Sequence, residues 1–157
     1  MKFSELKTTK KGILGEQIIT KYLEDKGWVV YNPSTKNKAH YFDILATKNK
    51  EKVIAIDVKT KARLNNWDAQ GIDFKHYKQY LKFTQDTSVP FWLFFVDDKT
   101  GQVHCSDVTT LKNGFFPCNH IIAWRLSQMY FLFKISEEQI LNISKLDTRK
   151  HKFNPKN

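Results

Sequence analysis

The stretch "VIAIDVKTKAR", Val53–Arg63, places opposite charges in a segment that otherwise has the composition of a buried strand. The run from Val53 to Lys59 is apolar except at Asp57 and Lys59, which predicts a strand. Because side chains alternate along a strand, Asp57 and Lys59 project from the same face. A buried carboxylate is costly unless it is paired or binds a metal. The alternatives are a strand end whose charges meet solvent or each other, and a functional site.

A second carboxylate lies upstream, where "HYFDILAT" predicts a strand over His40–Thr47 with Asp43 among apolar residues. The turn "KNKEK" joins this strand to the next, so the two strands are expected to pair antiparallel and bring Asp43 close to Asp57. Close carboxylates repel each other, and a divalent cation between them removes that cost. Oxygen ligands with open positions suit Mg²⁺ or Mn²⁺. The alternative for Asp43 is an ordinary cap at the start of a strand.

A third carboxylate, Glu16, lies in the stretch 10–26, "KKGILGEQIITKYLEDK", whose apolar stripe predicts a helix. Gly27 follows as its expected C-cap. Gly12 and Gly15 carry no side chains, which would let the first part of this helix approach a strand or a ligand closely. Taken alone, Glu16 also fits an ordinary acid near the positive end of a helix dipole.

The remaining pattern predicts a mixed α/β protein. A strand is expected at 28–32, an irregular polar segment at 61–71, a helix at 73–84, and strands at 90–97 and 102–108. Further strands are expected at 120–124 and 128–135. A capping box of Ser136 and Gln139 predicts a helix over 137–146, and a basic disordered tail is expected at 147–157.

Composition limits the function. The 157 residues suit one domain, and a net charge of +10 favours a polyanionic partner, either nucleic acid or an acidic membrane surface. Two cysteines are too few for a disulfide scaffold. The pairs His104-Cys105 and Cys118-x-His120 fit zinc spacings poorly, so we interpret them as core or surface residues. The chain shows neither a signal peptide nor an apolar run of membrane-spanning length, so we expect a cytoplasmic protein without membrane association.

A helix glutamate, a strand aspartate and D-x-K on the next strand together resemble the PD-(D/E)XK nuclease superfamily. The resemblance covers residues 10–108. Within it, the sequence is similar in particular to archaeal Holliday-junction resolvases and to a homing-endonuclease branch that shares the G-x-x-G-E helix. It implies a restriction-endonuclease-like α-β-β-β-α-β core with a mixed central sheet. The expected organisation is a nuclease core at 1–110, a C-terminal β/α extension packed on it at 111–146, and the tail.

The resemblance also implies the roles of the charged residues. Glu16, Asp43, Asp57 and Lys59 would be catalytic, and Glu16, Asp43, Asp57 and Val58 would hold Mg²⁺ or Mn²⁺. The chain departs from the family at Phe42, where proline is common, and has Asp57 where glutamate is commoner. The last third of the chain matches no known pattern, which leaves the substrate and any partner open.

Basic residues surround the expected site. We assign DNA contacts to Lys36, Lys38, Lys61, Arg63, Lys75 and Lys78, although a solvated surface is the alternative for any one lysine. Ser34 stands where the resolvases keep a functional serine, so the resemblance adds it to these contacts. Gln70, Tyr77 and Tyr80 stand where the superfamily often keeps a polar or aromatic helper. Trp67 fits equally a ring that stacks on a base and one that packs a loop.

The resemblance implies a metal-dependent DNA endonuclease, and one option for its substrate is a DNA structure of the kind that Holliday-junction resolvases cut. One alternative is a sequence-specific homing or restriction-type endonuclease. Others are a nucleic-acid-binding module or an interaction subunit that keeps the nuclease fold. A two-strand cutter favours a homo-oligomer, either a dimer or a tetramer.

Overall fold

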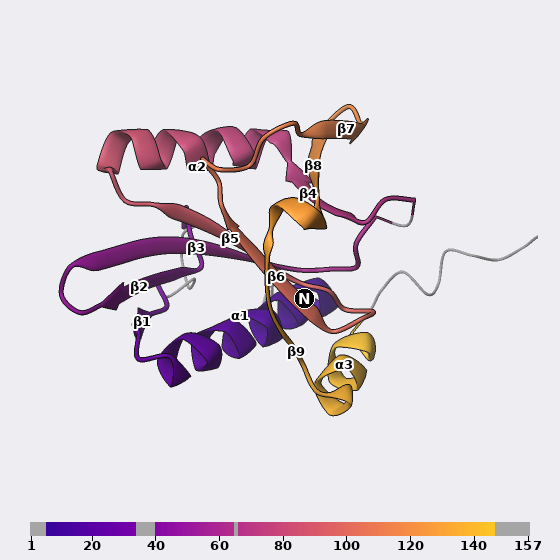
Figure 1. Ribbon diagram of the computed structural model, residues 1–157. Coiled ribbons are helices and arrows are strands. Elements are labelled where there is room, and N and C mark those ends of the chain that lie inside the picture. The colour runs from indigo at the N-terminus through magenta and orange to yellow at the C-terminus, as the bar shows by residue number, and fades with distance from the viewer. Residues whose placement is uncertain (1–5, 34–39, 65, 147–157) are drawn as a thin grey trace, which may run out of the picture.

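A six-stranded mixed sheet forms the centre of the computed structural model, which describes residues 6–33, 40–64 and 66–146 (Figure 1). The strand order is β1-β2-β3-β5-β6-β9. The strands are β1 (Val29–Tyr31), β2 (Ile44–Lys48), β3 (Lys52–Thr60), β5 (Phe91–Val96), β6 (Gln102–Asp107) and β9 (Tyr130–Lys134). β3 and β5 run parallel, and every other neighbouring pair is antiparallel. The mixed central sheet predicted from the sequence is confirmed.

Helices cover both faces of this sheet (Figure 1). They are α1 (Lys7–Asp25), α2 (Phe74–Thr87) and α3 (Glu137–Ser144). On one face, Ile19 and Leu23 of α1 pack with Ile56 and Val58 of β3 in a buried apolar cluster. On the other face, Tyr80 of α2 packs in a second cluster that includes buried aromatic side chains of β5. β3 is therefore covered on both faces, as its apolar composition requires.

A second, smaller sheet lies beside the start of α2 (Figure 1). It consists of β4 (Ala69–Asp73), β8 (Ile121–Arg125) and β7 (Phe115–Cys118), in the order β4-β8-β7. The prediction of irregular chain over 61–71 is wrong from Ala69 onward, and the sequence analysis did not predict β7. β4 has little strand propensity of its own and is held by its pairing with β8. A Cβ added at Gly71 would lie 2.8 Å from the Ile122 carbonyl oxygen, so this position requires glycine's lack of a side chain.

Local signals set several element boundaries as predicted. Gly27 takes a φ of +83° after the last turn of α1, and the capping box of Ser136 and Gln139 opens α3. Asn49 and Lys50 both have positive φ in the three-residue hairpin turn, Asn49–Glu51, that joins the paired Lys48 of β2 and Lys52 of β3. α1 begins at Lys7 rather than at residue 10, because its N-cap, Leu6, supplies no side-chain signal. β2 begins at Ile44 rather than at His40.

The stretch 111–146, predicted as an extension, supplies β7 and β8 to the small sheet and β9 to the edge of the central sheet. The predicted tail at 147–157 lies outside the described residues. Among the helices that the structure describes, none combines the length and the apolar character needed to cross a bilayer.

Candidate active site

Pairing of β2 with β3 brings Asp43 alongside Asp57. Ile44 pairs with Ile56, and the Asp43 N–H donates to the Ile56 carbonyl at 2.9 Å. One carboxylate oxygen of Asp43, Oδ2, accepts a hydrogen bond from the Val58 N–H at 2.8 Å. Asp43 is therefore hydrogen-bonded to β3 at Ile56 and at Val58, the residues before and after Asp57.

Asp57 and Lys59 form an ion pair, as expected for two charges on one face of a strand. The Lys59 ammonium lies 3.1 Å from Oδ1 and 2.8 Å from Oδ2 of Asp57. Asp57 is only 6% exposed, whereas the Lys59 side chain is 28% exposed. Oδ2 is buried, and no N–H or O–H of the described residues is aligned to donate a hydrogen bond to it. The Lys59 ammonium, 2.8 Å away, is a charged contact of that oxygen.

Glu16 reaches the same cluster because α1 lies unusually close to β3. A Cβ built at Gly15 would lie 1.8 Å from Thr60 Oγ1, so only glycine permits this approach. Burial raises the pKa of Glu16, the charge of Asp57 raises it further, and Lys59 opposes both. Glu16 is therefore within electrostatic reach of Asp57 and Lys59.

The pKa of Asp43 is raised to about 7, mainly by burial and then by the charge of Asp57. The hydrogen bond from Val58 lowers it, the charge of Glu16 raises it, and Lys59 lowers it. Near neutral pH, Asp43 is thus divided between its protonated and ionised forms. Such a perturbed carboxyl beside a second one is typical of a catalytic or metal-binding site.

A pocket of about 490 Å³ opens onto this cluster, between the segment before β2 and one side of α2. It is lined by His40, Tyr41, Asp57, Lys59, His76, Gln79 and Tyr80. Tyr80 stacks on Phe91 with ring centroids 4.2 Å apart, and burial followed by the charge and hydrogen bond of Asp57 raises the pKa of its hydroxyl. Sequence reasoning considered Tyr80 but missed both histidines and Gln79. The i, i+3, i+4 spacing of His76, Gln79 and Tyr80 places them on one helix side, but only the fold shows that this side faces Asp57.

The expected DNA contacts are distributed unevenly. Lys75 and Lys78 are exposed on α2. Arg63 is engaged inside the protein, with its Nε donating to Asp97 at 2.8 Å and its other nitrogens contacting Asp68, Thr100 and Gln102. The Lys61 ammonium donates to the Gly71 carbonyl. Ser34, Lys36 and Lys38 lie outside the described residues.

The residues present fit a divalent ion of the magnesium type. In the part of the chain that the structure describes, no group of three or more His, Cys, Asp or Glu side chains is close enough to form a complete metal cage. Mg²⁺, however, is usually bound by one or two carboxylates and completed by water and substrate phosphates. Asp43 and Asp57 offer two neighbouring carboxylates, one with a buried oxygen that lacks a hydrogen-bond donor.

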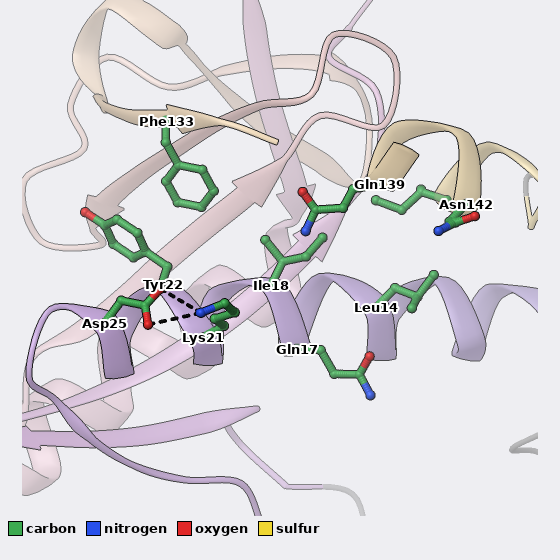
Figure 2. Close-up of a pocket in the computed structure, with 10 residues that line it drawn as sticks. Leu14, Gln17, Ile18, Lys21, Tyr22, Asp25, Phe133, Gln139 and Asn142 are labelled. Atoms are coloured by element: carbon green, nitrogen blue, oxygen red, sulfur yellow. Dashed lines mark hydrogen bonds and ion pairs between the residues drawn. The ribbon is translucent and has the colours of Figure 1, made fainter. Parts of the chain in front are cut away.

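Another hollow, of about 440 Å³, lies between α1, β9 and α3, and neither Asp43 nor Asp57 lines it (Figure 2). Its walls include Leu14 and Ile18, and Tyr22 stacks on Phe133 at 4.6 Å. Its charged residues, Lys21 and Asp25, pair with each other across one helical turn at 2.9 Å. This hollow therefore offers packing surface rather than reactive groups.

Comparison with proteins of known structure agrees with the fold described above. The chain aligns with a solved structure of Hjc, a Holliday junction resolvase from Archaeoglobus fulgidus, with a TM-score of 0.56 and 15% identity over 74% of this chain and 90% of that one. It thus has the restriction-endonuclease-like fold predicted from its motifs. D212, a nuclease from a fusselovirus, aligns with a TM-score of 0.46 and 11% identity over 85% of this chain and 89% of that one, a score too low to carry weight.

In sequence, the chain is 26% identical over 122 residues to a UPF0102 protein of Fervidobacterium nodosum. The alignment covers 77% of this chain and 87% of the relative. No family model matches the chain.

The raised pKa of Asp43 predicts how stability depends on pH in the metal-free protein. The folded state holds a proton on Asp43 up to about pH 7, whereas an unfolded aspartate releases it near pH 4. Stability should therefore fall as pH rises from about 4 to 7, and the cost should be complete above that range. Asp43→Asn retains an acceptor for the Val58 N–H and removes the charge. We expect this variant to exceed the parent by roughly 1–3 kcal/mol at pH 8 and to match it at pH 4.

Denaturant unfolding in EDTA at both pH values measures this difference. Asp86→Asn is the matched control, because Asp86 is a half-exposed partner of Lys82 on α2 and should show little pH-dependent gain. Adding Mg²⁺ at pH 8 should stabilise the parent more than Asp43→Asn, since a bound cation offsets the carboxylate charge. A parent and variant that differ equally at both pH values would show that Asp43 is not perturbed in this way.

Proposed function

We propose that this protein is a divalent-metal-dependent DNA endonuclease that hydrolyses phosphodiester bonds at the Asp43, Asp57 and Lys59 cluster. The observation that carries the proposal is the ion pair of the buried Asp57 with Lys59, which lines an open pocket and lies beside Asp43. The alternative, in which Asp57 and Lys59 are only an ion pair at the end of a strand, explains neither the second carboxylate nor the pocket. The fold shared with Hjc, a Holliday junction resolvase, supports the same class of activity.

In this proposal each side chain has a separate role. Asp43 and Asp57, with the main chain of Val58 and with Glu16 behind them, would hold Mg²⁺ or Mn²⁺. The bound ion would supply Lewis-acid polarisation of the scissile phosphate and of a water. Lys59 would position the attacking water and offset the negative charge that grows on the phosphate oxygens as the 3′ oxygen departs. Tyr80 lines the same pocket as Asp57 and would donate a hydrogen bond from its hydroxyl to that carboxylate.

A structure-specific substrate, such as a four-way junction, is the first candidate. The fold shared with Hjc, a Holliday junction resolvase, supports this candidate. The net charge of +10 also suits recognition through the DNA backbone. Sequence-specific cleavage is the second candidate, with a symmetric dimer or tetramer in either case. Incubation of the purified protein with Mg²⁺ or Mn²⁺ and linear, supercoiled or four-way-junction DNA distinguishes them. Preferential symmetric cutting of the junction supports the first, and discrete fragments from the linear duplex support the second.

Binding should depend strongly on salt. The chain carries 26 Lys and Arg against 16 Asp and Glu, and we expect this excess to act mainly on phosphates. With about five phosphate contacts and a slope of about −0.9 each, a fourfold rise in salt should weaken binding roughly 500-fold. Fluorescence anisotropy at two salt concentrations, in EDTA and with two unrelated duplexes, measures the effect. Near-equal affinity at both salts, or a large preference for one duplex, would contradict it.

A further inference from the structure

The free edge of the small sheet presents aromatic rings to solvent. β7 is the edge strand of that sheet, and successive residues Phe115 and Phe116 project to opposite sides of it. Phe116 is 52% exposed and Trp67, in the loop before β4, is 36% exposed. Rings of this size gathered on one edge indicate an interaction surface rather than isolated exposed residues.

On one side of β7 the rings lie beside an arginine. The rings of Trp67 and Phe115 have centroids 5.6 Å apart, and the Arg125 guanidinium lies 6.0 Å from the Phe115 ring centre. Arg125 pairs with Ala69 across the sheet, next to Asp68. The Asp68 carboxylate contacts Arg63, so that acid is already engaged by another guanidinium. This side therefore combines two neighbouring, mutually tilted rings with an exposed cation.

On the other side of β7 the same combination recurs with a lysine. Phe116 meets Phe74 edge to face, with centroids 5.2 Å apart, and the Lys78 ammonium lies 5.0 Å from the Phe74 ring centre. Asp73, the residue before Phe74, caps α2 by accepting a hydrogen bond from the Lys75 N–H at 2.9 Å. Both sides of the edge thus pair an aromatic ring with a cation within cation–π distance.

The chemistry of this edge selects its partner. Pro117 lacks an N–H, and the pairing of β7 with β8 is irregular between Phe115 and Cys118, so the edge is a poor template for an added strand. A second copy of the chain would bring the same net charge of +10. A ligand that offers both planar rings and anionic groups can contact the aromatic rings and the cations together. Unpaired nucleotides have this composition.

We infer that the two sides of the β7 edge together form a stacking platform for unpaired nucleotides that cross this edge. One side presents Trp67, Phe115 and Arg125, and the other presents Phe74, Phe116 and Lys78. The inference rests on the proposed function for the identity of the ligand and adds a second contact outside the cleavage pocket. α2 connects the two, because it carries Phe74 and Lys78 of the stacking platform and His76 and Gln79 of the pocket. DNA whose strands separate near the pocket could thus be held on both at once.

The test compares a ligand that has bases with one that lacks them. Anisotropy in EDTA measures binding of a labelled oligodeoxythymidylate and of an abasic strand of equal length. Phe116→Ala and Trp67→Ala should weaken binding of the thymidylate strand at least fivefold and leave the abasic strand unchanged, since each stacked base contributes through its ring. Phe131→Ala is the matched control, because Phe131 is 56% exposed on β9 of the other sheet.

Two further variants separate the loss of a ring from the loss of apolar packing and from the loss of a phosphate contact. Phe116→Leu keeps apolar bulk and loses the ring, so it should weaken thymidylate binding even if Trp67→Ala disturbs its loop. Arg125→Gln should weaken binding of both strands, because it removes a phosphate contact.

Three results would overturn the inference: ring variants that bind the thymidylate strand like the parent, equal losses on both strands, or self-association of the parent that Phe116→Ala abolishes. DNA cleavage that Lys59→Ala removes would then still support the proposed function. Base-dependent binding without any cleavage by the parent would support the stacking platform and contradict the nuclease.

Discussion

Lys59→Ala should lose DNA cleavage by about 10²–10⁴-fold while binding DNA nearly as well as the parent. The reason is the position of Lys59, whose ammonium lies 2.8 Å from Asp57 within the pocket and not among the exposed lysines of α2. It acts on the charge that develops at the reacting phosphate, whereas binding depends on many phosphate contacts. Cleavage rates in Mg²⁺ and affinities in EDTA separate the two effects.

Lys52→Ala is the matched control, because Lys52 begins the same strand at its opposite end and is exposed. It should cut and bind like the parent. If Lys59→Ala cuts as fast as the parent, the reactive cluster lies elsewhere. If it loses binding and cleavage in equal proportion, Lys59 holds DNA rather than assisting the reaction.

The second large effect is expected at Gly15. A Cβ there would lie 1.8 Å from Thr60 Oγ1 and 3.1 Å from Thr60 Cβ, so Gly15→Ala must push α1 away from β3. Overpacking of this kind costs about 1–3 kcal/mol, which for a chain of this size corresponds to roughly 2–10 °C in Tm. Glu16 moves with the helix, so cleavage should fall as well. Thermal unfolding and cleavage assays measure the two losses.

Gly12→Ala serves as the control in the same helix. Beyond its chain neighbours and the adjacent helix backbone, no atom of the described residues lies within 4 Å of a Cβ placed at Gly12, so alanine should stabilise the helix by about 0.5–1 kcal/mol. Thr60→Ala should restore part of the stability lost in Gly15→Ala, since it removes the clashing hydroxyl. A Gly15→Ala protein as stable and active as Gly12→Ala would show that the close contact of α1 with β3 is unimportant.

Local sequence signals were sufficient for the central sheet and the charged cluster. β3 was identified by its apolar run, the short turn after β2 fixed the pairing that brings Asp43 to Asp57, and the D-x-K spacing put Lys59 beside Asp57. The absence of bulk at Gly15 also indicated a close approach of the helix, and the structure shows Thr60 as the neighbour. A close approach was also expected at Gly12, but the structure places no close neighbour there.

Features that depend on distant pairing could not be predicted. β4 becomes a strand only through its partner β8, about fifty residues later in the chain. The pocket is formed by α2 and the segment before β2, so His40 and His76 become neighbours of Asp57 only in the folded chain. Arg63 carries a charge suited to DNA, yet Asp97, which follows β5, engages it inside the protein. In each case the deciding contact joins residues that the local pattern does not relate.

The most direct test of the proposed site is a cleavage assay on four-way-junction and supercoiled DNA with the parent and with Asp57→Asn, each in Mg²⁺ and in EDTA. Asparagine keeps the size of the buried side chain and removes the charge that pairs with Lys59 and faces Asp43. Our account predicts cutting by the parent in Mg²⁺, none in EDTA, and none by Asp57→Asn in either condition. Cutting by Asp57→Asn at the parent's rate, or equal cutting by the parent in EDTA, would contradict it.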